Sequence, residues 1–276
     1  MTEETLGRIF IFWRRENMDF TRITSKDNAI IKSILQLQKS SSKRKDEGVF
    51  ILEGLRLCLD AIQNSYSVNT VIVSDSALNK YSEKVKELYE NSNEKYLIPD
   101  SLFQKISDTV SPQGILCVCD LPKIDFSNLN SNYKYIALEN LQDPSNLGAI
   151  SRTAEALGIN GIIMQGGCDP YSPKSLRASM GALLRIPVYQ TNDMFEVFKS
   201  VSITSYAAVV DSSAKKANEM SFNCGSVIII GNEANGLTPD TISKSDETIT
   251  IPMSGRAESL NAAVAASILM WEMTKC

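Results

Sequence analysis

Apolar, β-branched runs alternate with amphipathic segments along nearly the whole chain. The pattern predicts helices at residues 28–37, 55–62 and 81–89, and strands at residues 48–52, 70–74 and 114–121. Val and Ile are frequent in these strands, which is typical of a buried sheet. We therefore expect a small α/β domain at residues 20–121.

A second alternation follows an interruption at residues 122–133. There, Asp, Ser and Asn replace the periodic pattern, which predicts a linker between two domains. Beyond it, the pattern predicts strands at residues 134–139, 160–164, 185–190, 205–210, 226–231 and 248–252, and helices at residues 147–157, 174–180, 193–200 and 259–273. Strands separated by helices predict a mostly parallel sheet flanked by helices, in a second domain at residues 134–276.

The net negative charge of the chain limits how it could bind a nucleic acid. Its 276 residues are enough for two domains, and its hydrophobic (43%) and charged (22%) fractions are those of a globular protein. The formal net charge is -4, so no global positive field attracts RNA or DNA. Binding to a nucleic acid would therefore depend on where lysines and arginines cluster.

The chain contains no histidine, which excludes His-based catalytic triads, His proton shuttles and zinc sites with imidazole ligands. Its six cysteines form no C-x-x-C pair, so we expect no metal site. Scattered thiols in a chain of this length are typical of a reducing compartment.

No stretch approaches the roughly 20 apolar residues that a membrane-spanning helix needs. The apolar run at residues 9–13 is too short for the core of a signal peptide, and Arg14 and Arg15 end it. We therefore expect a cytoplasmic protein in which residues 1–19 form an N-terminal extension.

The first segment with candidate chemistry covers residues 140–158. It begins a helix that Ser145 or Asn146 is suited to cap. Gly148 and Arg152 share one helix face, so we expect the guanidinium to lie over the bare glycine backbone, where it could bind a phosphate or hydroxyl oxygen. On spacing alone, a capped helix with a surface arginine is the favoured interpretation.

The second segment is the loop Gly231-Asn-Glu-Ala-Asn-Gly-Leu237, which follows an apolar strand. Ligands bind at this end of the strands in open α/β sheets, and glycines let backbone amides approach a flat ligand such as adenine. The loop matches neither the G-x-G-x-x-G dinucleotide fingerprint nor a phosphate loop. By itself, it is also compatible with an ordinary turn between a strand and a helix.

The third segment, residues 251–266, joins the last strand to the last helix. We expect Ser259 to cap that helix. Four alanines near the helix start permit close backbone packing, and a tightly packed terminal helix explains them well. It explains the polar sequence Ser259-Leu260-Asn261 less well.

Taken in this order, the three segments are similar to those of the SpoU (TrmH-type) RNA 2′-O-ribose methyltransferases of the SPOUT superfamily. The resemblance covers about residues 134–274 and is carried by N-x-G-x-x-x-R at 146–152, S-M-G-A at 179–182, R-I-P-V at 185–188, G-N-E-x-x-G-L at 231–237 and I-P-M-x-G-x-x-x-S-L-N at 251–261. The region before it, including residues 44–48, Phe50, Glu53-Gly54 and 111–114, resembles the small RNA-binding domain that often precedes this one.

The resemblance implies a catalytic domain whose sheet is threaded into a trefoil knot, and a homodimer that packs around the final helix. S-adenosylmethionine would bind within the knot, largely through backbone groups, at the positions Gly231, Asn232, Ile251 and Leu260. The residues implied around the reaction centre are Arg152, Asn146, Glu233, Ser259 and Asn261. In the front domain, we expect RNA contacts at Lys43, Arg44, Lys45 and Glu53, although a solvated charged loop explains the three basic residues equally well.

Two positions depart from the family pattern. Ala234 stands where the family often has glycine, and Ala262-Ala263 replaces a usual Val-Ser. Neither change removes a reactive group, but both affect packing at the expected cofactor site and dimer interface.

The reaction implied is an in-line displacement at a methyl group, for which alignment is the main requirement. Without histidine, the candidate proton acceptors are Glu233, water and Arg152. Because arginine stays protonated in proteins, we expect Arg152 to activate the hydroxyl by hydrogen bonding and electrostatics.

The expected function is therefore S-adenosylmethionine-dependent 2′-O-methylation of RNA, with ribosomal RNA first and transfer RNA second. One rival is a catalytically silent RNA-binding protein, against which the retained motif residues argue. A second rival is a nucleotide-dependent oxidoreductase, which the absent glycine fingerprint disfavours.

Overall fold

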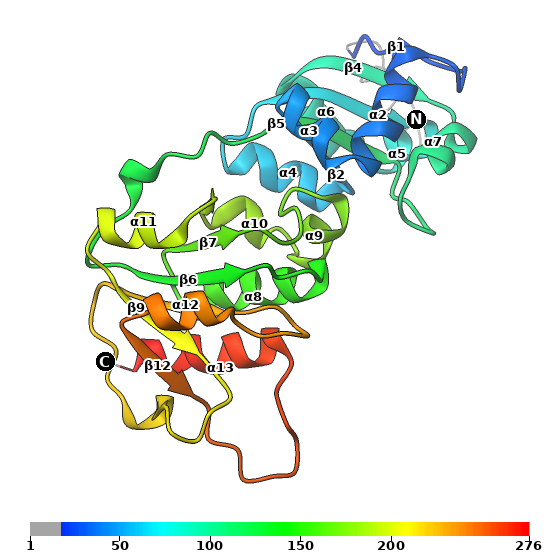
Figure 1. Cartoon of the computed structure of the whole chain (residues 1–276). Helices are drawn as coiled ribbons and strands as arrows, with labels where there is room; N and C mark the ends of the chain where they lie inside the picture. Colours follow the sequence, from blue (N-terminus) through cyan, green and yellow to red (C-terminus); the bar gives the residue numbers. More distant parts are fainter. Residues whose placement is uncertain (1–17, 276) are drawn as a thin grey trace, which may run out of the picture. The chain divides into compact units, whose positions relative to one another are not determined.

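The computed structural model describes residues 18–275, so most of the predicted N-terminal extension lies outside the described residues. The chain divides into two units, Met1–Pro122 and Lys123–Cys276 (Figure 1). None of the described helices has both the length and the apolar character that crossing a bilayer requires.

The first unit is a five-stranded mixed sheet with helices around it. The strand order is β1-β4-β3-β5-β2, where β1, β4 and β3 run parallel and β5 pairs antiparallel with β3 and β2. The strands are β1 (Thr21–Arg22), β2 (Val49–Glu53), β3 (Val68–Ser74), β4 (Ser92–Ile98) and β5 (Ile115–Asp120). The helices are α2 (Ala29–Lys39), α3 (Ser41–Glu47), α4 (Leu55–Gln63), α5 (Asp75–Lys80), α6 (Ser82–Glu90) and α7 (Asp100–Ile106).

Five elements of this unit were not predicted, namely β1, α3, α5, β4 and α7. Strand β4 begins with the polar sequence Ser92-Asn-Glu-Lys95 and has only two residues of β1 on its outer side, so it lacks the apolar alternation of a central strand. The basic segment at residues 39–45 is also largely helical. Ser40 caps a separate helix there, α3, which ends at Gly48 with a φ of 66°.

The second unit is a seven-stranded sheet in which every neighbouring pair is parallel, with the order β10-β12-β9-β11-β6-β7-β8. The strands are β6 (Lys134–Glu139), β7 (Gly161–Gln165), β8 (Val188–Thr191), β9 (Thr204–Ala208), β10 (Lys215–Lys216), β11 (Ser226–Ile230) and β12 (Glu247–Thr250). The α-helices are α8 (Pro144–Ala156), α9 (Pro173–Ala178), α10 (Ala182–Arg185), α11 (Met194–Ser200), α12 (Pro239–Lys244) and α13 (Ala262–Thr274).

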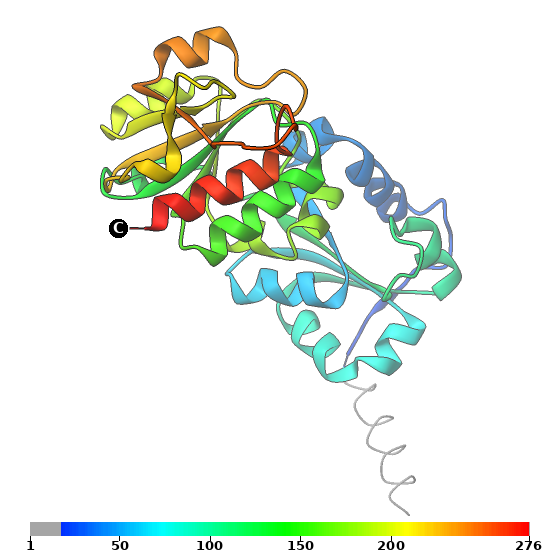
Figure 2. The ribbon, with the colours of Figure 1, turned by 90° about the horizontal axis from the view of Figure 1, so that it is seen from below.

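Helices cover both faces of this sheet, as the sequence pattern predicted. Helices α8 and α13 lie side by side on one face, and α11 and α12 lie on the other (Figures 1 and 2). On the α11 face, Tyr135, Ala137 and Ile229 of the central strands pack with Met194 and Phe198 of α11. The mostly parallel sheet flanked by helices is thus confirmed.

The order of the strands sets the position of the functional segments. Strand β11 is inserted between β6 and β9, and β12 lies on the outer side of β9. The carboxyl ends of β6, β11, β9 and β12 therefore lie along one sheet edge, and the first motif follows β6, the second β11 and the third β12. The trefoil knot implied by the resemblance stays a prediction.

Two helix starts differ from the expectation. Asp143, rather than Ser145 or Asn146, caps α8 by accepting a hydrogen bond from the Ser145 amide at 2.8 Å, with Pro144 in the first helical position. Asn261, rather than Ser259, caps α13 by accepting from the Ala263 amide at 2.9 Å. Both caps lie directly before the first helical residue, where the side chain can reach the free amides.

Part of the segment 122–133, which was expected as a linker, packs onto the second unit. Leu129 is buried with the core of that unit, and the Tyr135 hydroxyl accepts a hydrogen bond from the Asn130 amide at 2.8 Å. The strand expected from residue 185 begins only at Val188, because residues 182–185 form α10.

The bare backbone of Gly148 is used for helix packing rather than by Arg152. A Cβ atom there would lie 2.4 Å from the Cβ and 2.5 Å from the carbonyl carbon of Ala178. Helices α8 and α9 therefore approach each other at this point, and Ala178 fills the space beside Gly148 where the Arg152 guanidinium was expected.

We predict that Gly148→Ala destabilises the protein by about 1–3 kcal/mol, because backbone atoms of Ala178 would have to move. Gly255→Ala is the matched control, since a Cβ at Gly255 meets no atom within 4 Å. Urea unfolding measures both. Equal midpoints for Gly148→Ala and the wild type would contradict this account of the α8–α9 contact.

Candidate active site

The three motifs meet in one chain of side-chain hydrogen bonds. Asn261, at the start of α13, donates through Nδ2 to Oδ1 of Asn146 at 3.0 Å. Asn146, in the first turn of α8, donates through Nδ2 to Oε1 of Glu233 at 3.0 Å. These contacts join residues that are 115 and 87 positions apart in the sequence. Three of the five predicted reaction-centre residues therefore lie together.

The Glu233 carboxylate has several donors. Besides Asn146, the backbone amides of Gln142 and Asp143 donate to it at 3.0 and 2.9 Å. Burial by itself would raise the pKa of Glu233, but the hydrogen bonds from Gln142, Asn146 and Asp143 outweigh it and hold that pKa below its ordinary value. The side chain is therefore an ionised acceptor that fixes the turn before α8, and it is poorly suited to take up a proton.

The loop that carries Glu233 is closed by its own backbone. The Asn232 and Gly236 amides donate to each other's carbonyl oxygens at 3.0 and 2.9 Å. Gly231 permits this closure, because a Cβ on it would lie 2.2 Å from the carbonyl carbon of Gly236. The glycine was expected to admit a ligand, whereas here it admits the loop's own backbone.

Asn232 belongs to the same closed loop. Its Oδ1 accepts from the Ala234 amide at 2.9 Å, and its Nδ2 donates to the carbonyl oxygen of Asn140 at 3.0 Å. The Asn232 side chain therefore ties the second motif to the end of β6.

Two predicted reaction-centre residues stand outside this network. Arg152 is exposed on α8 and makes no hydrogen bond or ion pair with any residue that the structure describes. Ser259 is exposed in the loop before α13. Next to Arg152, the hydroxyls of Thr153 and Ser267 lie 3.1 Å apart and connect α8 to α13.

A pocket opens at the carboxyl ends of β9 and β12. It is partly open to solvent and has a volume of about 80 Å³, which is smaller than the usual range for small-molecule sites. Its walls are the ends of these strands, the loop after β12 and one side of α13, including Ile251, Met253, Ser259, Leu260, Ala265 and Leu269. Of the four predicted cofactor residues, Ile251 and Leu260 line this pocket, and Gly231 and Asn232 do not.

The lining suits S-adenosylmethionine in part. Aliphatic side chains such as Leu260 and Leu269 fit a flat, weakly polar ring, and Thr250 and Ser259 offer hydroxyl groups. Ser259 and Leu260 directly precede Asn261, so the pocket adjoins the hydrogen-bonded chain.

The basic cluster of the first unit is less available than its sequence suggests. Arg44 is buried, and its guanidinium donates to the Leu37 carbonyl oxygen at 2.5 Å, which holds α3 against the end of α2. The expected phosphate contact at Arg44 is therefore wrong. Lys43 pairs with Glu47 at 2.7 Å, a contact that raises the pKa of Lys43, and Lys45 is exposed.

Glu53 also has an internal role. Its buried carboxylate accepts from the Thr109 hydroxyl at 2.7 Å and the Asp108 amide at 3.0 Å, besides the hydroxyl of Ser107. It orders the loop after α7, so the expected RNA contact at Glu53 is wrong.

Residues around the turn before α8 were missed by the sequence analysis. Asn140 has a left-handed backbone with a φ of 51°, and Gly167 follows β7 with a φ of 87°. A Cβ on Gly167 would lie 2.3 Å from the carbonyl oxygen of Leu141, so this glycine lets the two loops touch. The Gly166-Gly167 pair directly after a strand was the signal that could have pointed to this contact.

Comparison with known proteins agrees with this geometry. Residues 133–271 match the SpoU rRNA Methylase family, and residues 28–117 match the MRM3-like substrate binding domain. A Synechocystis protein named as an uncharacterized tRNA/rRNA methyltransferase is 30% identical over 92% of this chain and 93% of its own length. The 23S rRNA (guanosine(2553)-2′-O)-methyltransferase RlmP of Bacillus subtilis is 28% identical over 91% of this chain and 98% of its own length.

A solved structure shows the same similarity in three dimensions. The crystal structure of an AdoMet-bound rRNA methyltransferase from Sinorhizobium meliloti superposes with a TM-score of 0.81 at 26% identity, and the match covers 92% of this chain and 97% of that one. The family match covers half of this chain, and the relatives match nearly all of it. The chain therefore belongs to the SpoU rRNA methylase family.

Proposed function

We propose that this protein transfers a methyl group from S-adenosylmethionine to a ribose 2′-hydroxyl of ribosomal RNA. The observation that carries the proposal is the hydrogen-bonded chain Asn261–Asn146–Glu233, which joins the three motifs beside the pocket. The names of the Bacillus and Sinorhizobium relatives support ribosomal RNA and the cofactor. Transfer RNA is the alternative substrate, because the name of the Synechocystis relative includes it.

The cofactor supplies an electrophilic methyl group, and Ile251, Ser259 and Leu260 are the pocket residues proposed to hold it. Gly231 and Asn232 act more indirectly, since they shape the neighbouring loop. Alignment of reacting groups is worth about 7–11 kcal/mol in favourable cases, so residues that only hold the substrate can supply much of the catalysis.

In the proposed mechanism, Asn146 and Asn261 orient the ribose, and Arg152 donates hydrogen bonds to the 2′-oxygen and stabilises its developing negative charge. Glu233 holds Asn146 in place. Because its carboxylate is already an acceptor for three donors and its pKa is lowered, we assign the hydroxyl proton to water rather than to Glu233.

The protein is proposed to act as a homodimer that packs through α13. Val264 and Trp271, two turns apart on one face of this helix, are 48% and 54% exposed. The helix is apolar on all sides, and such a helix is normally covered all round. Arg152 lies on the neighbouring helix α8 without a partner among the described residues, so the second copy could complete the site around it.

Lys43 and Lys45 remain proposed phosphate contacts of the first unit. We propose a cytoplasmic location, which the free thiols of the described cysteines and the ribosomal substrate support.

The first test is ribose-methylation mass spectrometry of ribosomal and transfer RNA from cells with and without the gene. One 2′-O-methyl nucleotide should be lost from ribosomal RNA and restored by the wild type. Arg152→Ala should slow methylation on the order of 10²-fold, because a donor to the developing charge is removed. Lys199→Ala, an exposed cation on α11, is the matched control. Unchanged methylation in both RNA pools would contradict the proposal.

The proposed RNA-binding role of the first unit can be tested by the salt dependence of RNA binding. Replacing Lys43 and Lys45 by Gln should lower the slope of log K against log salt by about 0.7–0.9 for each phosphate that the variant no longer neutralises. The control replaces Lys84 and Lys86 of α6, where Lys86 pairs with Glu90 in the same spacing as Lys43 with Glu47. Equal slopes for the first variant and the wild type would rule out phosphate binding by Lys43 and Lys45.

The dimer can be tested by light scattering of the purified protein. Val264→Glu should shift a dimer to monomers, because a charge would be buried at the proposed interface. Val110→Glu in the first unit, where Val110 is 94% exposed, should leave the mass unchanged. A wild type that is monomeric at micromolar concentration would refute the proposed dimer.

A further inference from the structure

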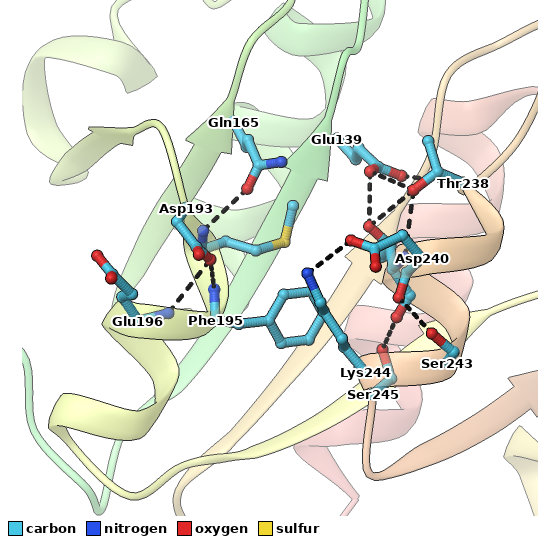
Figure 3. A network of polar contacts seen from close by, with 12 residues as sticks. Glu139, Gln165, Asp193, Phe195, Glu196, Thr238, Asp240, Ser243, Lys244 and Ser245 are labelled. Carbon is cyan, nitrogen blue, oxygen red and sulfur yellow. Dashed lines mark hydrogen bonds and ion pairs between the residues drawn. The ribbon is translucent and has the colours of Figure 1, made fainter.

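Glu139 is a buried carboxylate at the carboxyl end of β6, and it was not among the predicted site residues. It is 3% exposed. Its oxygens accept from the Thr238 amide at 2.9 Å, the Thr238 hydroxyl at 2.9 Å and the Thr241 hydroxyl at 2.6 Å (Figure 3). All three donors are neutral, and within the described residues Glu139 makes no ion pair.

These donors come from the segment that directly follows the loop Gly231–Leu237. Thr238 also caps α12, because its hydroxyl accepts from the Thr241 amide at 3.2 Å. A buried carboxylate is costly unless donors satisfy it, and an amide in its place would turn an N–H group toward these donors. The contact therefore depends specifically on a carboxylate at position 139.

Asn140, which follows Glu139, contacts the first part of the loop Gly231–Leu237. Asn140, with its left-handed backbone, accepts through its carbonyl oxygen from Nδ2 of Asn232 at 3.0 Å. The end of β6 thus contacts the loop at Asn232 and again at Thr238. Glu233, which holds Asn146, lies between these two points of attachment.

Strand β7 offers an internal comparison. Gln165, at the same end of β7, accepts from the Met194 amide at 2.9 Å and so holds the start of α11 (Figure 3). Here the residue that reaches across from the strand is neutral, and the carboxylate that caps α11, Asp193, belongs to the helix start itself. No predicted site residue lies in the loop before α11. A strand end can therefore contact the start of a covering helix through a neutral side chain, in contrast to the buried carboxylate of Glu139.

We propose that Glu139 is a positioning residue for the S-adenosylmethionine site. Through Thr238 and Thr241, it fixes the far end of the loop Gly231–Leu237, so that Glu233 and Asn232 keep their contacts with the first motif. This inference rests on the proposed function, and it adds a residue that acts through the loop without touching substrate or cofactor.

The test measures S-adenosylmethionine binding to the full-length protein by calorimetry, together with thermal unfolding. Glu139→Gln should weaken binding roughly tenfold at a temperature well below its unfolding midpoint, because losing one hydrogen bond to a charged group is an effect of that order. Amide exchange in the loop should become faster, whereas exchange in β11 should not.

Asp246→Asn is the matched control. Asp246 accepts from the Ser205 amide and hydroxyl at 2.8 and 2.7 Å, at the amino ends of β9 and β12, which is the opposite edge of the sheet. This variant should lower the unfolding midpoint while S-adenosylmethionine binding stays within about twofold of the wild type.

A second pair of variants decides the case if Glu139→Gln does not fold. Thr241→Val removes one donor and should weaken binding, and Thr241→Ser, which keeps the hydroxyl, should restore it. Binding by Glu139→Gln or Thr241→Val at wild-type strength would overturn the inference and leave the proposed function intact. A wild type that does not bind S-adenosylmethionine would overturn the proposed function and this inference with it.

Discussion

The hydrogen bond from Asn146 to Glu233 is the contact on which the arrangement of the site depends. It joins the first turn of α8 to the loop after β11, and Asn261 extends it to the start of α13. The parallel sheet makes this contact possible, because inserting β11 between β6 and β9 brings the carboxyl ends of distant strands together. Each asparagine both donates and accepts, so moving one motif would disturb the other two.

The exposed residues that we propose to be covered in the working enzyme lie on the same face of the sheet. Arg152, Val264 and Trp271 are exposed on α8 and α13, two helices that pack side by side on one face of the sheet. The chain orders Asn146, Glu233 and Asn261 but leaves Arg152 without a partner among the described residues, and this is the place where we propose that RNA and a second copy complete the site.

Sequence reasoning found the elements with strong periodicity and misplaced the side chains whose roles depend on distant neighbours. Strand β6 was predicted with its observed bounds, since its apolar run is buried on both faces. Asn261 was missed as a helix cap. Its Oδ1 accepts from the Ala263 amide while its Nδ2 donates to Asn146, and sequence spacing predicts neither hydrogen bond. Arg44 was taken for a surface cation because a helix as short as α3 shows too little periodicity to reveal its buried face.

The resemblance placed Asn146, Glu233 and Asn261 in one site, and the physical reason that these three side chains meet is visible only in the fold. No spacing rule connects Glu233 with the amides of Gln142 and Asp143, because these meet through strand order. The same limit hid Glu139, whose partners lie about a hundred positions away, beyond the reach of any periodicity argument.

Three of the acidic residues have a structural role. Glu53 and Glu139 each order a loop by accepting hydrogen bonds from a backbone amide and from hydroxyls, and Glu233 does so by accepting from two backbone amides and the Asn146 side chain. Two of them are buried, so their charges are not presented to an approaching RNA as surface carboxylates would be. In a chain without histidine, carboxylates that serve as fixed acceptors are poor candidates for moving protons. The chemistry at this sheet edge therefore depends on how accurately these acceptors hold Asn146, Asn261 and the pocket in place, which is the form of catalysis that a methyl transfer with a good leaving group needs most.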